Sequence, residues 1–283
     1  MEYVIDMIMR GRMISVWTLG GLAAWVVMSA AWGWAGPFRP AAGVEGSHAI
    51  YMEDTAFVAW ADDVDQYQVG ENVDSTWQTP EKALGPAEGT SFEVVSLGAG
   101  GKITLTFDPP VRNGDGWDFA VFENGFDDTF LELAYVEVSS DGSVFIRFDN
   151  TSLTPDPIPS FGTVDPTHID GLAGKYRQGY GTPFDLEELS GKQEVLQGDV
   201  DLMAITHIRI VDIVGDGTYL DSSGVGIYDL YPTFGSAGFD LDAVGVSNGA
   251  PYPEGDWVEP DYPAEDGEAG FGDVSGCFIN VRR

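Results

Sequence analysis

The sequence is short of cysteine, of basic residues and of histidine. Cys277 is its only cysteine, so no disulfide can form within one chain. The 283 residues hold 13 Lys and Arg against 46 Asp and Glu, a formal net charge of −33. Binding to phosphates needs a basic patch, so nucleic acid and anionic membrane surfaces are not expected partners. The three histidines lie far apart and form no short-spaced metal-binding pair.

Long apolar runs are also absent, with one exception at the N-terminus. Two arginines precede an apolar stretch over residues 13–34, which ends among the small residues Ala31 and Ala35. This pattern is typical of a secretory signal peptide. We therefore expect residues 1–35 to be removed and the protein to be secreted or held at the cell surface. The stretch is long enough to span a bilayer, so an uncleaved anchor is the alternative; we expect no membrane span in the mature chain.

The body of the chain alternates in twos, as half-buried strands do. Ile103, Leu105 and Phe107 fall on one face of residues 102–107, with threonines on the other. Residues 134–139 alternate in the same way, and a Ser-Asp-Gly turn leads into residues 144–148, which predicts a hairpin. Four further runs, bounded by Gly, Pro, Asn or Asp, are strand candidates: residues 92–97, 117–122, 205–213 and 239–246.

Helix signals are few and short. Thr79-Pro80 and Thr182-Pro183 each place an N-cap before a proline, the second ahead of residues 186–189. About seven antiparallel strands with such short helices predict an all-β fold, an antiparallel β-sandwich or jelly roll.

The predicted strands are separated by long loops, which are usually functional in a compact domain. The two longest, residues 151–181 and 215–238, are rich in Pro, Gly, Asp and Tyr. From residue 248 the chain turns to Pro, Gly and acids without periodicity. We place a β-sandwich domain at residues 36–247 and an acidic tail at 248–283, either disordered or the remnant of a sorting tail.

Five segments stand out as a set: residues 83–86, 96–101, 118–125, 137–142 and 238–244. Together they resemble a family of bacterial exported cell-surface proteins, often with C-terminal sorting tails, whose core is a galactose-binding-like (discoidin-like) jelly roll. The resemblance implies a surface-located binding or structural module. Residues 270–279, with glycines around Cys277, look like the opening of a sorting tail.

No motif predicts an enzyme. Ser247 lies in a Gly-x-Ser-x-Gly pattern, but the prolines that follow forbid the helix that a nucleophile elbow needs. The glycines of residues 98–101 lack the lysine and helix of a phosphate loop and indicate a hairpin turn. Glu132 and Glu137 could in principle form a glycosidase pair, yet 46 acids make coincidental pairs common. A glycoside hydrolase is therefore the least favoured hypothesis.

Aromatic residues in or beside the loops favour carbohydrate binding. Flat rings suit the C–H faces of sugars, while nearby acids and amides bind hydroxyl groups. The alternative is that these rings pack under their own loops, in a structural or adhesive surface protein without a small ligand. Glycans or other surface proteins are then the expected partners. The predicted ligand-binding residues are Trp117, Tyr176, Tyr180 and Tyr228.

Acidic residues in two segments predict a structural calcium site. Calcium takes six to eight oxygens, so several acids must converge from irregular backbone. Asp240 and Asp242 share one face of a strand with Val244 and Val246, a largely apolar side, where carboxylates need a metal or a basic partner. The alternative is an arginine such as Arg209 or Arg147 as the partner, or an exposed sheet end. The predicted metal ligands are Asp115, Asp118, Glu123 and Asn124 in the first segment and Asp240 and Asp242 in the second.

Overall fold

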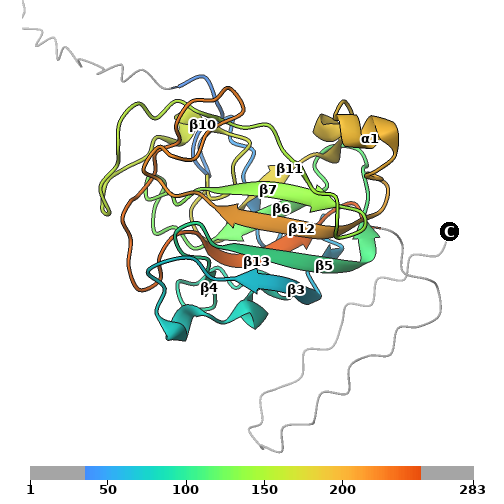
Figure 1. The fold of residues 1–283 in the computed structure, drawn as a ribbon, viewed down its shortest axis with the longest axis horizontal. Coiled ribbons are helices and arrows are strands. Elements are labelled where there is room, and N and C mark those ends of the chain that lie inside the picture. Colours follow the sequence, from blue (N-terminus) through green and yellow to red (C-terminus); the bar gives the residue numbers. More distant parts are fainter. Residues whose placement is uncertain (1–35, 250–283) are drawn as a thin grey trace, which may run out of the picture. The chain divides into compact units, whose positions relative to one another are not determined.

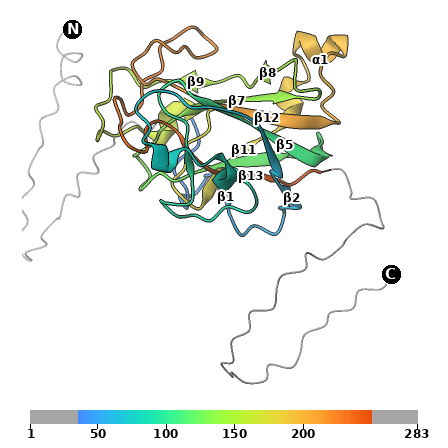
Figure 2. The same cartoon turned by 60° about the horizontal axis from the view of Figure 1, so that its bottom comes forward.

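The computed structural model of the protein describes residues 36–249. The predicted signal peptide, residues 250–283 of the predicted tail and Cys277 lie outside the described residues. Within residues 36–249, two antiparallel β-sheets face each other as layers (Figures 1 and 2). The predicted all-β sandwich with few short helices is therefore confirmed. No helix in this part of the chain is long and apolar enough to cross a membrane.

One layer is a five-stranded sheet. Its order is β3 (Asp63–Gln68), β5 (Lys102–Val111), β12 (Ile205–Asp212), β7 (Ala134–Ser139) and β8 (Ile146–Arg147). Strands β7 and β8 form the predicted hairpin, in which Glu137 pairs with Arg147. Its Asp141 stabilises the turn by accepting hydrogen bonds from the amides of Ser143 and Val144.

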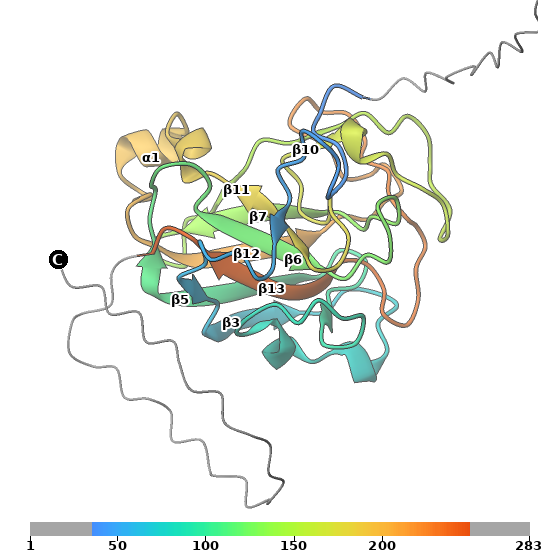
Figure 3. The ribbon, with the colours of Figure 1, turned by 180° about the vertical axis from the view of Figure 1, so that it is seen from behind.

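The other layer is a six-stranded sheet, seen from behind in Figure 3. Its order is β1 (Ile50–Tyr51), β11 (Tyr180–Phe184), β6 (Phe119–Glu123), β13 (Asp240–Val246) and β2 (Ala59–Trp60), and β4 (Val95–Ser96) also pairs with β13. A separate pair joins β9 (Thr151–Ser152) to β10 (Ile169–Asp170).

The helices are single turns or little more. The 3₁₀ turns are η1 (Ser75–Trp77), η2 (Pro80–Ala83), η3 (Pro166–His168) and η4 (Leu186–Leu189), and α1 spans Gln193–Gln197. The predicted proline start of η2 is present. The second predicted helix start was wrong, because Thr182 and Pro183 belong to strand β11 and Asp185 caps η4 through the amide of Glu187.

The main core lies between the two sheets. Ile103, Leu105 and Phe107 of β5 are buried there, as their alternation predicts. From the other sheet, Val121 of β6 and Val244 of β13 belong to the same cluster. Burial of this apolar surface is the principal stabilising contribution, on the order of 25 cal/mol per Å².

A β-bulge changes which residues of β13 face that core. Leu241 pairs with Glu123 but Ala243 pairs with Phe122, so one extra residue is accommodated between them. Leu241, Val244 and Val246 all point into the main core. The expectation that Asp240 and Asp242 share a face with Val244 and Val246 was therefore wrong, because the bulge shifts the alternation by one residue.

The two long loops predicted at residues 151–181 and 215–238 contact each other at the end of the sheets away from α1 (Figures 1 and 3). Ile158 forms a parallel bridge with Leu230, and the amide of Tyr231 donates to the Ile158 carbonyl at 3.2 Å. Ser160 donates from its hydroxyl to the carbonyl of Pro232. A second buried cluster packs beneath these loops and includes Leu131, Leu133, Val164, Leu172 and Ile227. The loops therefore have an apolar base of their own.

Candidate functional site

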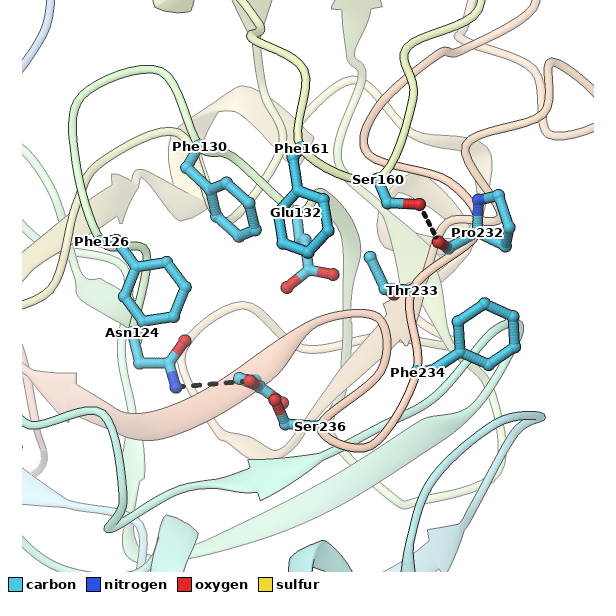
Figure 4. A pocket seen from close by; sticks show the side chains of 11 residues that line it. Asn124, Phe126, Phe130, Glu132, Ser160, Phe161, Pro232, Thr233, Phe234 and Ser236 are labelled. Carbon is cyan, nitrogen blue, oxygen red and sulfur yellow. Dashed lines mark hydrogen bonds between the residues drawn. The ribbon is translucent and has the colours of Figure 1, made fainter.

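A pocket of about 300 Å³ opens where these loops meet the ends of β6 and β13 (Figure 4). The β6–β7 connection supplies Asn124, Phe126, Phe130 and Glu132. The two joined loops and the first residue of β13 complete the lining with Ser160, Phe161, Pro232, Thr233, Phe234, Ser236 and Asp240. The two loops thus line a concave surface, and the prediction that they are functional can be tested there.

Phenylalanine side chains form the walls of the pocket. Phe126 and Phe130 pack against each other, with ring centroids 5.1 Å apart and planes inclined by 49°. Phe161 is 91% exposed, and Phe126 and Phe234 are also largely exposed. Large apolar side chains gathered around a concavity and left open to water mark an interaction site.

The floor is acidic and buried. Glu132 is 5% exposed and Asp240 is 3% exposed, and Glu123 is buried behind them. The Glu132 carboxylate points into the pocket between the phenylalanine rings (Figure 4). Oε1 of Glu132, Oε1 of Glu123 and Oδ1 of Asp240 have no hydrogen-bond partner among residues 36–249. Buried acceptors are rarely left in this state, so each needs a donor or a cation.

The partners that these acids do have are few. Oδ2 of Asp240 accepts from the side-chain amide of Asn124 at 3.3 Å, and Oε2 of Glu123 accepts from the Gly125 amide at 2.8 Å. The hydroxyls of Ser96 and Ser236 also lie beside the Asp240 carboxylate and lower its pKa. No ion pair within residues 36–249 involves Glu123, Glu132 or Asp240.

Burial and mutual repulsion raise the pKa of the carboxyl groups on the pocket floor. Burial raises the pKa of Glu132 well above its ordinary value, and the charges of Asp240 and Glu123 raise it further. Burial also raises the pKa of Glu123 strongly and that of Asp240 to about 6. The pocket floor therefore attracts positive charge, whether a proton or a cation.

Two further acids lie behind the floor and hold the backbone. Asp212, at the end of β12, accepts from the amides of Gly100 at 2.8 Å and Phe239 at 2.7 Å. Asp229 accepts from the amide of Leu133 at 2.9 Å. Burial raises the pKa of both, that of Asp212 to about 8. Their hydrogen bonds fix the loops that carry the pocket lining.

The predicted calcium ligands of the first segment separate into two groups. Asp115 is exposed. Asp118 is buried and accepts from the amides of Gly114 at 2.9 Å and Leu186 at 2.7 Å. It precedes β6, whereas Glu123 and Asn124 stand at the other end of that strand, about 16 Å away at 3.3 Å per residue. The six predicted ligands therefore do not form one site.

Asp242 of the second segment is buried without needing a cation. Its Oδ1 accepts from the amide of Glu88 at 3.0 Å and its Oδ2 from the amide of Gly89 at 2.9 Å. The alternative arginine partners are engaged elsewhere, because Arg147 and Arg209 both bind Glu137, at 2.7 Å and 3.5 Å. Glu137 is thus held on the face of the five-stranded sheet and forms no pair with Glu132.

Of the predicted metal ligands, the structure brings together Glu123, Asn124 and Asp240. Among residues 36–249, no group of three or more His, Cys, Asp or Glu is arranged to hold a metal ion. The calcium site stays a prediction, and the pocket floor is where the acids without partners gather.

The predicted ligand-binding aromatics lie outside the phenylalanine pocket. Trp117 lines a different, more open pocket of about 480 Å³ and packs against Phe57 at 5.3 Å. Tyr176 is buried, and Tyr180 packs against Tyr51 at 5.4 Å. Tyr228 is half-buried in the loop that precedes β13. These residues are dispersed, and the ring of Tyr176 packs edge-on against His48, with centroids 6.2 Å apart.

Sequence reasoning missed the four phenylalanines and the role of Glu132. A usable signal was present, because Phe126, Phe161 and Phe234 stand in Gly-, Pro- and Asp-rich loops without alternation. An apolar side chain in such a loop has no strand face to occupy. It either packs locally or serves a ligand.

Comparison with known proteins provides no relative from which a function could be carried over. Neither the models of known protein families nor the curated protein sequences give a match to this chain. The site is therefore interpreted from its own residues.

Proposed function

We propose that the protein is a secreted or cell-surface carbohydrate-binding module and that its site is the phenylalanine pocket. The observation that carries the proposal is the combination of exposed aromatic faces with buried acceptors that lack partners. Phe126, Phe161 and Phe234 supply the faces, and Glu132 and Asp240 supply the acceptors.

This combination suits a sugar because a sugar is amphipathic. The C–H face of a pyranose packs on an aromatic ring, while its hydroxyls donate to acceptors at the ring edge. Asn124, Ser160 and Ser236 add short polar side chains at the pocket wall. At about 300 Å³ the pocket is at the small end of ligand sites, which fits one sugar unit, for example the end of a chain.

The test is titration of the full chain with an oligosaccharide panel, by calorimetry, comparing wild type with Phe161→Ala. Phe161 is almost fully exposed, so its loss should leave the melting temperature unchanged. One well-placed aromatic contact contributes about 1–1.4 kcal/mol, so we expect roughly five- to tenfold weaker binding. The matched control is Leu196→Ala, an exposed apolar residue on α1 at the far end of the sheets.

The same exposed phenylalanines favour a second candidate, an adhesive protein that docks another surface protein. A protein partner would use Phe161 and Phe234 but would not depend on the buried floor. Two results together would select the adhesive function. The protein would bind no glycan, and it would bind a protein partner whose binding Phe161→Ala abolishes and Glu132→Gln leaves intact.

No hydrolysis is part of the proposal. Oligosaccharide recovered intact after incubation with the protein is the expected result. A shortened product that Glu132→Gln abolishes would instead assign the floor carboxylates to a glycosidase.

Export is the remaining part of the proposal. It is supported by the basic flank and the apolar run of residues 1–35. N-terminal sequencing of protein from the medium or the cell surface should give a start between Ala31 and Gly36. An intact Met1 on cytoplasmic protein would contradict it.

A further inference from the structure

We infer that the sugar bound in this pocket carries a protonated amino group, which lies between the carboxylates of Glu132 and Asp240. The inference rests on the proposed function and narrows it to amino sugars with a free amine.

The charge of the floor is the first argument. Glu123, Glu132 and Asp240 are each at least nine-tenths buried, and each has a carboxylate oxygen without a partner. Of these acids, Glu132 and Asp240 line the pocket directly. Burial favours the protonated forms of these acids in the ligand-free protein, and a neutral hydroxyl would satisfy an acceptor without adding the positive charge that stabilises the ionised carboxylates. An ammonium group satisfies both, because it brings one positive charge and three N–H donors.

The lining around the floor is the second argument. Phe126, Phe130 and Phe161 surround the Glu132 carboxylate (Figure 4). The face of an aromatic ring attracts a cation when the cation lies within about 6 Å of the ring centre. Rings and carboxylates in one concavity therefore select a cation that is carried by an organic group.

The spacing of the floor is the third argument. A calcium ion requires six to eight oxygens at about 2.3–2.6 Å from one point. Residues 36–249 contain no group of three or more acids arranged in that way. An ammonium donates to fewer and more widely separated oxygens, at about 2.8 Å each, and the sugar that carries it fills the remaining space.

The alternative cations of the chain itself are committed elsewhere. Arg177, the arginine of the loop that follows β10, binds Asp128 and the Ala42 carbonyl. Lys175 is buried and donates to the Ile169 carbonyl at 2.7 Å. In the described part of the chain, no lysine or arginine lines the pocket. Apart from a proton, the compensating charge then has to come from a ligand.

The experiment compares three ligands of equal length at pH 7: a glucosamine disaccharide, its N-acetylated form and the corresponding glucose disaccharide. Calorimetric titration of the full chain should give at least tenfold tighter binding for the free amine. Because the chain is strongly acidic, the titrations are repeated at 0.5 M salt, where long-range attraction is screened and the preference should persist.

Variants test whether the preference for the free amine arises at the pocket floor. Glu132→Gln should reduce it to threefold or less, and Asp240→Asn should do the same if Glu132→Gln does not fold. Glu194→Gln on α1 is the matched control and should keep the full preference.

Three results would overturn the inference. Equal binding of all three sugars would leave carbohydrate binding standing without amine recognition. If 0.5 M salt or Glu194→Gln removes the preference for the free amine, that preference reflects a general attraction of cations to an acidic protein. Calcium that displaces the amino sugar, and stabilises the wild type but not Glu132→Gln, would assign the floor to a metal. Binding of none of the sugars would instead remove the proposed function itself.

Discussion

The side-chain amide of Asn124 donates a hydrogen bond to the carboxylate of Asp240 at 3.3 Å, joining the end of β6 to the start of β13. The hydroxyls of Ser96 and Ser236 lie beside the same carboxylate, and with Asn124 they lower its pKa against the larger effect of burial. Asn124 also donates to the Ser91 carbonyl at 3.4 Å, so one amide orients the pocket floor against a neighbouring loop.

Asn124→Asp should destabilise the protein more than Asn124→Ala. Alanine removes the hydrogen bond and leaves the Asp240 oxygen unsatisfied, at a cost of about 1–3 kcal/mol. Aspartate adds a further buried negative charge beside Asp240 and Glu123, which are already crowded. Urea denaturation at pH 7 measures the difference. An aspartate variant as stable as the wild type would show that a proton or a cation already neutralises the added charge on the floor.

Asp118 should behave as a structural residue whose effect is independent of calcium. It accepts from the amides of Gly114 and Leu186 and from the side chain of Asn248 at 2.9 Å. Asp118→Ala leaves these donors unsatisfied and should lower the free energy of unfolding by about 2–4 kcal/mol. The measurement is thermal melting with millimolar calcium and with excess chelator. A loss that appears only with calcium would restore the predicted metal role.

The fold was predictable because alternation is a local property. Ile103, Leu105 and Phe107 repeat every second residue, and the Ser-Asp-Gly turn between two alternating runs indicates a hairpin. The face of Asp242 was not predictable, because the bulge between Leu241 and Ala243 arises from pairing with β6, a strand more than a hundred residues earlier in the chain. A single sequence carries no mark of such a register shift.

The site was predictable only in part, for a related reason. Glu123, Asn124 and Asp240 were identified as acids and an amide at strand ends, and they do meet. Glu132 joins them because the β6–β7 connection folds back over the strand ends, a long-range arrangement that composition cannot reveal. Asp118 resembled a ligand in the sequence, and backbone amides satisfy it in the fold.

The buried acids also predict how stability depends on pH. Folding raises the pKa of Asp212 to about 8 and of Asp240 to about 6, and raises those of Glu123, Glu132 and Asp229 well above their ordinary values, chiefly through burial. A carboxyl whose pKa is higher in the folded state binds its proton more tightly there. Its stabilising contribution is complete below the unfolded pKa of about 4 and is lost as pH rises through the folded pKa.

We therefore expect the ligand-free protein to melt at a higher temperature at pH 5 than at pH 8. Each group contributes about 1 kcal/mol per pH unit while its folded and unfolded forms differ in protonation. Below pH 4 the trend should reverse, because hydrogen bonds from backbone amides lower the pKa of Asp127 and Asp141.

Glu132→Gln should make the protein more stable at pH 8 and flatten its pH dependence, while weakening amine binding. Glutamine keeps the shape of the side chain and removes a buried charge that Asp240 and Glu123 repel. A residue whose replacement stabilises the fold is retained for function, so a gain of stability and a loss of binding in one variant would connect the charge to the ligand. Thermal melts from pH 4.5 to 8.5 measure the first effect, with Glu194→Gln as the unchanged control. A variant that melts lower than the wild type at pH 8 would mean that the Glu132 charge is already compensated without a ligand, and the pocket floor would then have no need of an amine.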